Sequence, residues 1–180
     1  MLDFLHHPFQ PLESKTVYQG PRFNVCQLEV KGLSGKRIQR DMIYHPGAVT
    51  ILPILDEKHV VMIKNERFAV GQTLLELPAG TLEPHEPPLE TARRELIEET
   101  GYQCNQLDFL TKFYTSPGFC NELMFTYVAK DLTFVGQRLE DSEKITTVVM
   151  SWDKLKQAIH QGEILDGKTL TTLLFYLSRM

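Results

Sequence analysis

The chain has 180 residues, of which 42% are hydrophobic and 23% are charged, and its formal net charge is −4. This length suits one domain of ordinary size with a substantial core, and the composition is normal for a soluble globular protein. The acidic balance and the lack of any lysine or arginine run argue against nucleic acid as the main partner. They leave room for a phosphorylated small molecule, because a metal ion can supply local positive charge.

The N-terminal part of the chain predicts a small β unit. Its first ten residues are too interrupted by His and Pro to be a signal peptide. The segments 14–20, 23–32 and 36–45 are strand-like, and a turn at residues 32–35 joins the last two. We therefore expect a β unit over residues 1–45, followed by a second domain over residues 46–180.

The second domain opens with apolar strands. Residues 48–55 read as a buried strand, and Asp56-Glu57-Lys58 turns the chain into residues 59–65. We expect these two strands to pair as a hairpin. Residues 74–78 form a further short apolar segment that leads into a loop.

Residues 89–100 predict a helix of about three turns. Pro87 and Pro88 stand where proline is tolerated at a helix start, and Gly101 suits the left-handed conformation that often ends a helix. Three apolar residues recur at the spacing of one helix face and predict a stripe toward the core: Leu89, Ala92 and Leu96.

Three carboxylates on this helix are the main chemical signal. Glu95, Glu98 and Glu99 stand at i, i+3 and i+4, so they project from one patch of the helix. Hard oxygen ligands gathered in this way suit Mg²⁺ or Mn²⁺, which bind carboxylates, waters and phosphates together. An isolated triplet of this kind is more often a solvated acidic face, but the residues around it favour a metal site. Arg94 is expected on a different side of the helix.

The rest of the chain predicts more strands and two helices. Residues 107–116 and 122–132 are strand-like and flank a loop, and residues 146–152 are a further strand. Residues 151–162 predict a helix with Ser151 as its N-cap, and residues 166–180 predict a second amphipathic helix. The order of elements predicts an α+β protein, with a mixed β-sheet covered by helices.

Cysteine usage and hydropathy bear on the compartment. Cys26, Cys104 and Cys120 lie far apart, without the spacing of a metal site or a disulfide framework, which fits a reducing compartment. No segment approaches the roughly 20 apolar residues of a membrane helix. We expect a cytoplasmic protein that does not bind membranes.

Nine residues follow the spacing G-x5-E-x7-R-E-L-x-E-E-x-G-Y. They are Gly80, Glu86, Arg94, Glu95, Leu96, Glu98, Glu99, Gly101 and Tyr102. This pattern resembles the signature of the Nudix hydrolases, with Tyr102 where an aliphatic residue is more usual. The resemblance implies the Nudix fold, a mixed sheet between helices, and metal-dependent hydrolysis of nucleoside diphosphates linked to another moiety.

The resemblance also implies roles for single residues. The metal ligands would be the carbonyl of Ala79 with Glu95, Glu98 and Glu99, and Arg94 would pair with Glu86 to support them. The general base would be Glu143, with Glu140 or a signature glutamate such as Glu98 as alternatives. A solvated acidic turn is the other interpretation of residues 139–145.

One position departs from the pattern. His85 stands where similar sequences often have glycine, so a positive φ at this position would strain the backbone. A metal or catalytic role for His85 is a weaker alternative.

Features outside the signature are similar to those of ADP-ribose pyrophosphatases. Pro117 lies 16 residues past Gly101 (117 − 101), and Glu122 follows it. By this resemblance Arg67 contacts a phosphate, Phe23 stacks on adenine, and Pro117 and Glu122 belong to the substrate site. Arg67 could instead be an exposed cation at the end of a strand. Phe23 could instead be a core aromatic residue. An N-terminal β unit of this length commonly exchanges between subunits in those enzymes, so a homodimer is implied.

The predicted function is hydrolysis of ADP-ribose to AMP and ribose 5-phosphate. One alternative is hydrolysis of another nucleoside diphosphate sugar, such as GDP-mannose or ADP-glucose. Glu66 departs from the subfamily pattern, since related sequences usually have an aromatic residue before the arginine, and this leaves the details of substrate packing open. A second alternative is a non-catalytic sensor of ADP-ribose, which the three retained glutamates disfavour.

Overall fold

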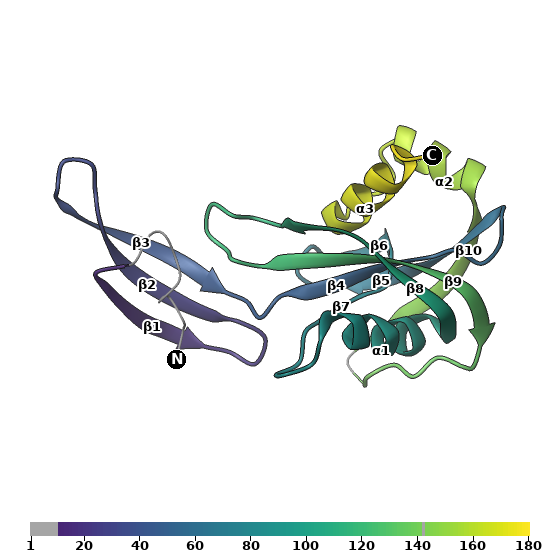
Figure 1. Cartoon of the computed structure of the whole chain (residues 1–180), viewed down its shortest axis with the longest axis horizontal. Helices are drawn as coiled ribbons and strands as arrows, with labels where there is room; N and C mark the ends of the chain where they lie inside the picture. Colours follow the sequence, from purple (N-terminus) through teal and green to yellow (C-terminus); the bar gives the residue numbers. More distant parts are fainter. Residues whose placement is uncertain (1–10, 142) are drawn as a thin grey trace. The chain divides into compact units, whose positions relative to one another are not determined.

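Strands make up most of the chain, and three helices lie among the described residues (Figure 1). The structure is a computed structural model that describes residues 11–141 and 143–180. The first ten residues, for which the sequence argues against a signal peptide, lie outside this range. By its contacts the chain divides into two units: residues up to Pro46 with Tyr114–Glu122, and Gly47–Phe113 with Leu123–Met180.

The first unit is built on a three-stranded antiparallel sheet in the order β1-β2-β3. Its strands are β1 (Glu13–Gln19), β2 (Asn24–Lys31) and β3 (Arg37–Tyr44). An isolated bridge between Ile43 and Cys120 links β3 to the Tyr114–Glu122 segment. The domain boundary predicted after His45 does not include this segment, because a sequence gives no sign that a later loop returns to an earlier sheet.

The second unit contains two sheets. One has four strands in the order β7-β4-β9-β8, and β4 runs parallel to β9 but antiparallel to β7. The other has three antiparallel strands in the order β10-β5-β6. The strands of the first are β4 (Ala48–Pro53), β7 (Ala79–Thr81), β8 (Tyr102–Tyr114) and β9 (Leu123–Phe134). Those of the second are β5 (His59–Arg67), β6 (Gln72–Glu76) and β10 (Ile145–Ser151).

The predicted hairpin of β4 with β5 is wrong. The turn forms, since Asp56 accepts hydrogen bonds from the backbone N–H groups of Lys58 and His59 at 2.7 and 2.8 Å. Beyond it only an isolated bridge joins Ile54 to Val60, and the two strands enter different sheets. Both edges of β4 are occupied, by β7 and by β9, so β5 has no edge of β4 to pair with.

Helices cover both faces of the sheets (Figure 1). Helix α1 (Pro88–Thr100) packs Ala92 and Leu96 on Val49 and Ile51 of β4. The alternate residue Leu52 belongs to a second cluster with residues of α2 (Trp152–His160) and α3 (Gly167–Leu177). This arrangement confirms the predicted α+β class, with two sheets in place of one.

Of two sequence predictions for the ends of the helices, the structure agrees with one and differs from the other. Ser151 caps α2 as predicted, because its side chain accepts a hydrogen bond from the N–H of Lys154. Leu89 was expected in the apolar stripe of α1, but it is 37% exposed because it lies in the first turn, beyond the sheet. No helix in the described ranges combines the length and the apolar character needed to cross a membrane.

Candidate functional site

The start and the end of helix α1 are set by a proline and a glycine of its own sequence. Pro88 occupies the first turn, where a missing N–H costs nothing. Gly101 ends the helix in the left-handed region at a φ of 77°, and its N–H bonds to the carbonyl of Ile97 at 2.8 Å. The glutamates of the signature therefore stand on a helix with a fixed start and end.

Two of the three glutamates are buried against strand β7. Glu95 is 8% exposed and Glu99 is 3% exposed, whereas Glu98 is half-buried. The N–H of Ala79 donates to Glu99 Oε2 at 2.7 Å. At Gly80 a β-carbon would lie 1.9 Å from the carboxyl group of Glu95, so a side chain there would have to displace that carboxyl group. Gly80 leaves room for this close approach, and its own φ is not positive.

Burial changes the acidity of both carboxyl groups. It raises the pKa of Glu95 to about 7, against the lowering effect of the Arg94 charge. It also raises the pKa of Glu99 to about 8, against the hydrogen bond from Ala79, and the negative charges of Glu95 and Glu143 add to the increase. A divalent cation would offset this burial and repulsion, because it favours the charged form of its ligands.

Arg94 connects the glutamates to the loop before the helix. Its Nε and Nη2 donate to Glu86 at 3.1 and 3.0 Å, and its Nη1 donates to Glu95 and Glu98 at 2.8 Å each. The hydrogen bonds from Arg94 lower the pKa of Glu86. A different side of the helix was expected for Arg94, and its long side chain reaches the carboxylates of Glu95 and Glu98 nonetheless. Thr91, which the sequence did not single out, also donates to Glu86, at 2.8 Å.

The loop before the helix contains a strained residue. His85 adopts a φ of 68°, in the region where glycine is favoured and a β-carbon is crowded. The strain expected from His85 is therefore present. Its neighbour Glu86 is fixed by Arg94 and Thr91, so the surrounding contacts hold this conformation in place.

The donor set of this region fits a divalent metal ion in its chemistry. Within the described part of the chain, no three acidic, histidine or cysteine side chains converge closely enough to form a metal cage by themselves. Mg²⁺ does not need such a cage, because it usually binds one or two carboxylates and completes its shell with waters and substrate phosphates. Carboxylate and backbone oxygens near Glu95 and Glu99 suit this kind of site.

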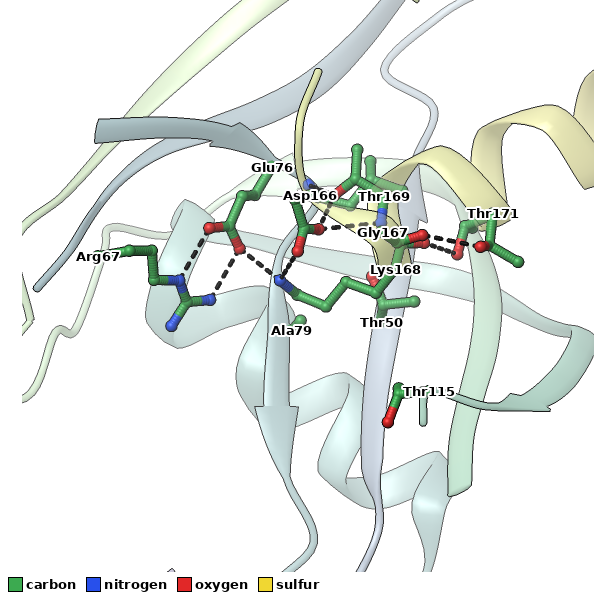
Figure 2. A network of polar contacts seen from close by, with 12 residues as sticks. Thr50, Arg67, Glu76, Ala79, Thr115, Asp166, Gly167, Lys168, Thr169 and Thr171 are labelled. Carbon is green, nitrogen blue, oxygen red and sulfur yellow. Dashed lines mark hydrogen bonds and ion pairs between the residues drawn. The ribbon is translucent and has the colours of Figure 1, made fainter. Parts of the chain in front are cut away.

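A second polar network joins Arg67, Glu76 and Lys168 (Figure 2). Arg67 donates through Nε and Nη2 to the two oxygens of Glu76, at 2.8 and 2.7 Å. Glu76 is fully buried and also accepts from Lys168 Nζ at 2.5 Å. Hydrogen bonding to Glu76 raises the pKa of Arg67, to which the charge of Glu99 also contributes. Sequence reasoning missed the roles of Glu76 and Lys168 in this network.

The acidic segment after β9 approaches the same helix. Arg138 N–H donates to the carbonyl of Glu98 at 3.0 Å, and the side-chain amide of Gln137 donates to the carbonyl of Glu99 at 2.6 Å. Further along, Glu140 N–H donates to the carboxylate of Glu143 at 3.0 Å. Glu143 lies near enough to raise the pKa values of Glu95 and Glu99.

Three of the expected substrate residues belong to the first unit. Phe23 is 41% exposed, and its ring centroid lies 6.1 Å from that of Tyr18. Pro117 lies in a turn in which the carbonyl of Ser116 accepts from the N–H of Phe119 at 3.1 Å. Glu122 accepts a hydrogen bond from Thr115 Oγ1 at 2.6 Å. The described contacts therefore do not bring these residues together with the carboxylates of α1.

Comparison with known families identifies the fold around this site. The NUDIX domain family matches residues 44–173, a span that includes α1, β7 and the Arg67 network. The chain belongs to the NUDIX family. A crystal structure described as that of an ADP compounds hydrolase superimposes with a TM-score of 0.81, covering 94% of this chain and 92% of the other, at 23% identity. The predicted Nudix fold is thus confirmed.

Two curated relatives match most of this chain. The ADP-ribose pyrophosphatase of Bacillus subtilis (strain 168) is 34% identical over 165 residues, which cover 88% of this chain and 89% of that protein. The methanol dehydrogenase activator of Bacillus methanolicus is 37% identical over 165 residues, with the same coverage. The similarity therefore extends beyond the signature, to nearly the whole length of both relatives.

Proposed function

We propose that this chain is a metal-dependent Nudix pyrophosphatase that hydrolyses ADP-ribose to AMP and ribose 5-phosphate. The observation that carries the proposal is the packing of the Ala79–Gly80 backbone against the carboxylates of Glu99 and Glu95. It gathers oxygen ligands beside an arginine, Arg67, whose pKa is raised mainly by Glu76 and also by Glu99. The name and the coverage of the Bacillus subtilis relative support ADP-ribose as the substrate.

In this proposal the carbonyl of Ala79 and the carboxylates of Glu95, Glu98 and Glu99 hold Mg²⁺, or Mn²⁺ in its place. When bound, the metal would neutralise the diphosphate and lower the pKa of a bound water. Arg94 keeps Glu95 and Glu98 in position through its Nη1 bonds. Glu86 in turn orients Arg94, so the loop and the helix keep one geometry.

Glu143 is the proposed general base. It accepts a proton from water as the water oxygen bonds to one phosphorus and the bond from that phosphorus to the bridging oxygen breaks. Its influence on the pKa values of Glu95 and Glu99 supports this assignment, because it requires Glu143 to lie near them. Glu140 and Glu98 are the alternative bases.

Four residues are proposed to bind the substrate. Arg67 contacts a phosphate, and its 37% exposed side chain leaves it accessible. Phe23 stacks on adenine, for which its partly exposed ring is suited. Pro117 and Glu122 are the two further residues proposed to contact the substrate.

The decisive experiment is nucleotide release from a panel of substrates, each tested with Mg²⁺ and with EDTA. The panel contains ADP-ribose, ADP-glucose, GDP-mannose, NADH and diadenosine polyphosphates. Metal-dependent cleavage that favours ADP-ribose is the expected result. A preference for another compound would keep the Nudix chemistry and reject the ADP-ribose assignment.

Two alternatives have less support. Relatives named GDP-mannose pyrophosphatases match a smaller share of this chain, 71% for that of Cronobacter sakazakii (strain ATCC BAA-894). A sensor that binds ADP-ribose without cleaving it does not require the three carboxylates that are proposed to bind the catalytic metal. Measurable binding without any cleavage in the panel would favour the sensor.

We also propose that the protein is a homodimer formed through the β1-β2-β3 sheet. Exposed apolar side chains on this unit support the proposal, among them Val17 at 52% and Tyr18 at 53% exposure. Light scattering of the full chain should give twice the monomer mass. The cytoplasmic location stays a prediction from cysteine usage.

A further inference from the structure

The start of helix α3 carries a lysine that the Nudix signature does not explain. Lys168 is the second residue of α3, and its side chain is only 14% exposed. Its Nζ donates to Glu76 Oε2 at 2.5 Å and to Asp166 Oδ1 at 2.7 Å. Glu76 lies 92 residues earlier in the chain, at the end of β6. A buried charge pair thus joins α3 to the strand that leads into Ala79.

The same carboxylate of Glu76 fixes one edge of Arg67. The two bonds from Nε and Nη2 form a bidentate pair, the geometry in which an arginine is held most rigidly. Among the described residues, Nη1 of Arg67 makes no hydrogen bond. Arg67 also lines an open hollow of about 350 Å³, together with Phe68 and Lys144. The hollow also contains Glu66, which pairs with Lys144 at 3.1 Å. A guanidinium that is 37% exposed and has Nη1 without a partner among the described residues keeps a donor available to an anion.

This network contains two positively charged and two negatively charged side chains, so its net charge is zero. Arg67 and Lys168 carry positive charge, while Glu76 and Asp166 carry negative charge (Figure 2). Without Lys168, Arg67 alone would have to compensate both carboxylates. An incoming phosphate would then compete with them for the guanidinium, because like charges near a binding site oppose anion binding.

We propose that Lys168 is a positioning residue for substrate binding, which acts through the buried carboxylate of Glu76 to keep the outer edge of Arg67 available to a substrate phosphate. This inference rests on the proposed hydrolysis of a nucleoside diphosphate sugar. Lys168 touches neither the substrate nor the metal ligands in this scheme. Its effect therefore falls on the affinity for the diphosphate and leaves the chemical step in place.

The test compares Lys168→Met with the unmodified protein in steady-state hydrolysis of ADP-ribose with Mg²⁺. We expect KM to rise at least about tenfold, the loss that a weakened charge-assisted hydrogen bond produces. We expect kcat to stay within about threefold, because the interaction is made in the ground state and the transition state alike. Thr171→Ala is the matched control. Thr171 lies on the exposed side of the same helix, and its hydroxyl bonds only to the carbonyl of Gly167.

A second variant covers the case in which Lys168→Met does not fold. Asp166→Asn/Lys168→Met removes one charge of each sign, so the remaining pair of Arg67 and Glu76 stays balanced, and an asparagine still caps α3. Because its charges stay balanced, we expect the KM of this variant to stay close to that of the unmodified protein. An unchanged KM in folded Lys168→Met, or a tenfold rise in KM in the folded double variant, would overturn the proposal.

A spectroscopic measurement separates this inference from the proposed function. The Nε–H resonance of Arg67 in a ¹⁵N–¹H spectrum, assigned with Arg67→Lys, reports the bidentate pair directly. It should shift or broaden in Lys168→Met and stay unchanged in Thr171→Ala. If the unmodified protein cleaves no substrate, the proposed function fails. The resonance still decides whether Lys168 holds Arg67, and an unchanged signal in Lys168→Met would overturn that claim.

Discussion

The carboxyl group of Glu95 occupies the space that a side chain on residue 80 would need. A β-carbon on Gly80 would lie 1.9 Å from it, far inside any real contact distance. Glycine at this position therefore leaves the carboxyl group of Glu95 its place against strand β7. Glu95 is one of the proposed metal ligands.

Gly80→Ala should move Glu95 and weaken metal binding. Overpacking of this kind costs about 1–3 kcal/mol of stability, and calorimetric titration with Mn²⁺ should show lower affinity. Gly118→Ala is the control for stability, since nothing lies within 4 Å of a β-carbon there. Equal urea midpoints and Mn²⁺ affinities for Gly80→Ala and the unmodified protein would contradict this account.

Glu99→Gln should abolish turnover and leave the fold intact. The amide oxygen can still accept the hydrogen bond from Ala79 N–H, but the ligand charge is lost. Circular dichroism checks the fold, and phosphate or nucleotide release checks the activity. Near-normal Mg²⁺-dependent turnover in a folded Glu99→Gln variant would remove Glu99 from the ligand set.

The raised pKa values of Glu95 and Glu99 predict how the metal-free protein responds to pH. Both values lie above the ordinary 4.5, at about 7 and about 8, so the folded state holds more protons than the unfolded state in between. The free energy of unfolding in EDTA should therefore fall as pH rises through this window. Urea unfolding at several pH values measures this slope, which should be shallower in Glu99→Gln. A stability that rises with pH would contradict the burial of these carboxyl groups.

Over the same pH window the affinity for Mg²⁺ should rise, because the metal binds only the deprotonated carboxylates. Isothermal titration in buffers of different ionisation enthalpy measures the protons released on binding. No proton release near neutral pH would argue against Glu95 and Glu99 as ligands.

Glu143→Gln should lower kcat by about 10²–10⁴-fold, the usual contribution of a general base. Mn²⁺ affinity should remain, because Glu143 is not among the proposed ligands. Glu140→Gln is the matched comparison, since Glu140 lies in the same segment and contacts Glu143 only through its backbone. An unchanged kcat in Glu143→Gln with a loss in Glu140→Gln would transfer the role to Glu140.

Thr169→Val should destabilise the protein without changing a charge. The hydroxyl of Thr169 accepts the hydrogen bond of Leu77 N–H at 2.9 Å in a fully buried position. Leaving that N–H without a partner costs about 1–3 kcal/mol. Thr172→Val serves as a control, because its hydroxyl bonds only to the carbonyl of Lys168 in the same helix. Equal denaturant midpoints for the two variants would contradict the role given to Thr169.

Local spacing explains what sequence reasoning predicted well. The helix with Glu95 and Glu99 on one patch, its proline start and its Gly101 end all depend on residues within a few turns of one another. The family assignment rested on the same short stretch, and the NUDIX match confirms it.

Contacts between distant segments explain what it missed. The pairing of β4 with β7 and β9 depends on strands far along the chain, and it displaced the expected hairpin. The reach of Arg94 depends on side-chain conformation, which helix periodicity does not describe. Glu76 and Lys168 are 92 residues apart, and neither is unusual until the fold brings them within 2.5 Å.

The anchoring of residues 137 and 138 on the end of α1 limits how far the proposed base can travel. Arg138 is tied to the carbonyl of Glu98, and Gln137 to that of Glu99. Glu143 lies only five positions after Arg138 (143 − 138), a tether that spans at most about 18 Å when fully extended. The proposed base is therefore confined to within this distance of the end of α1 that carries Glu98 and Glu99.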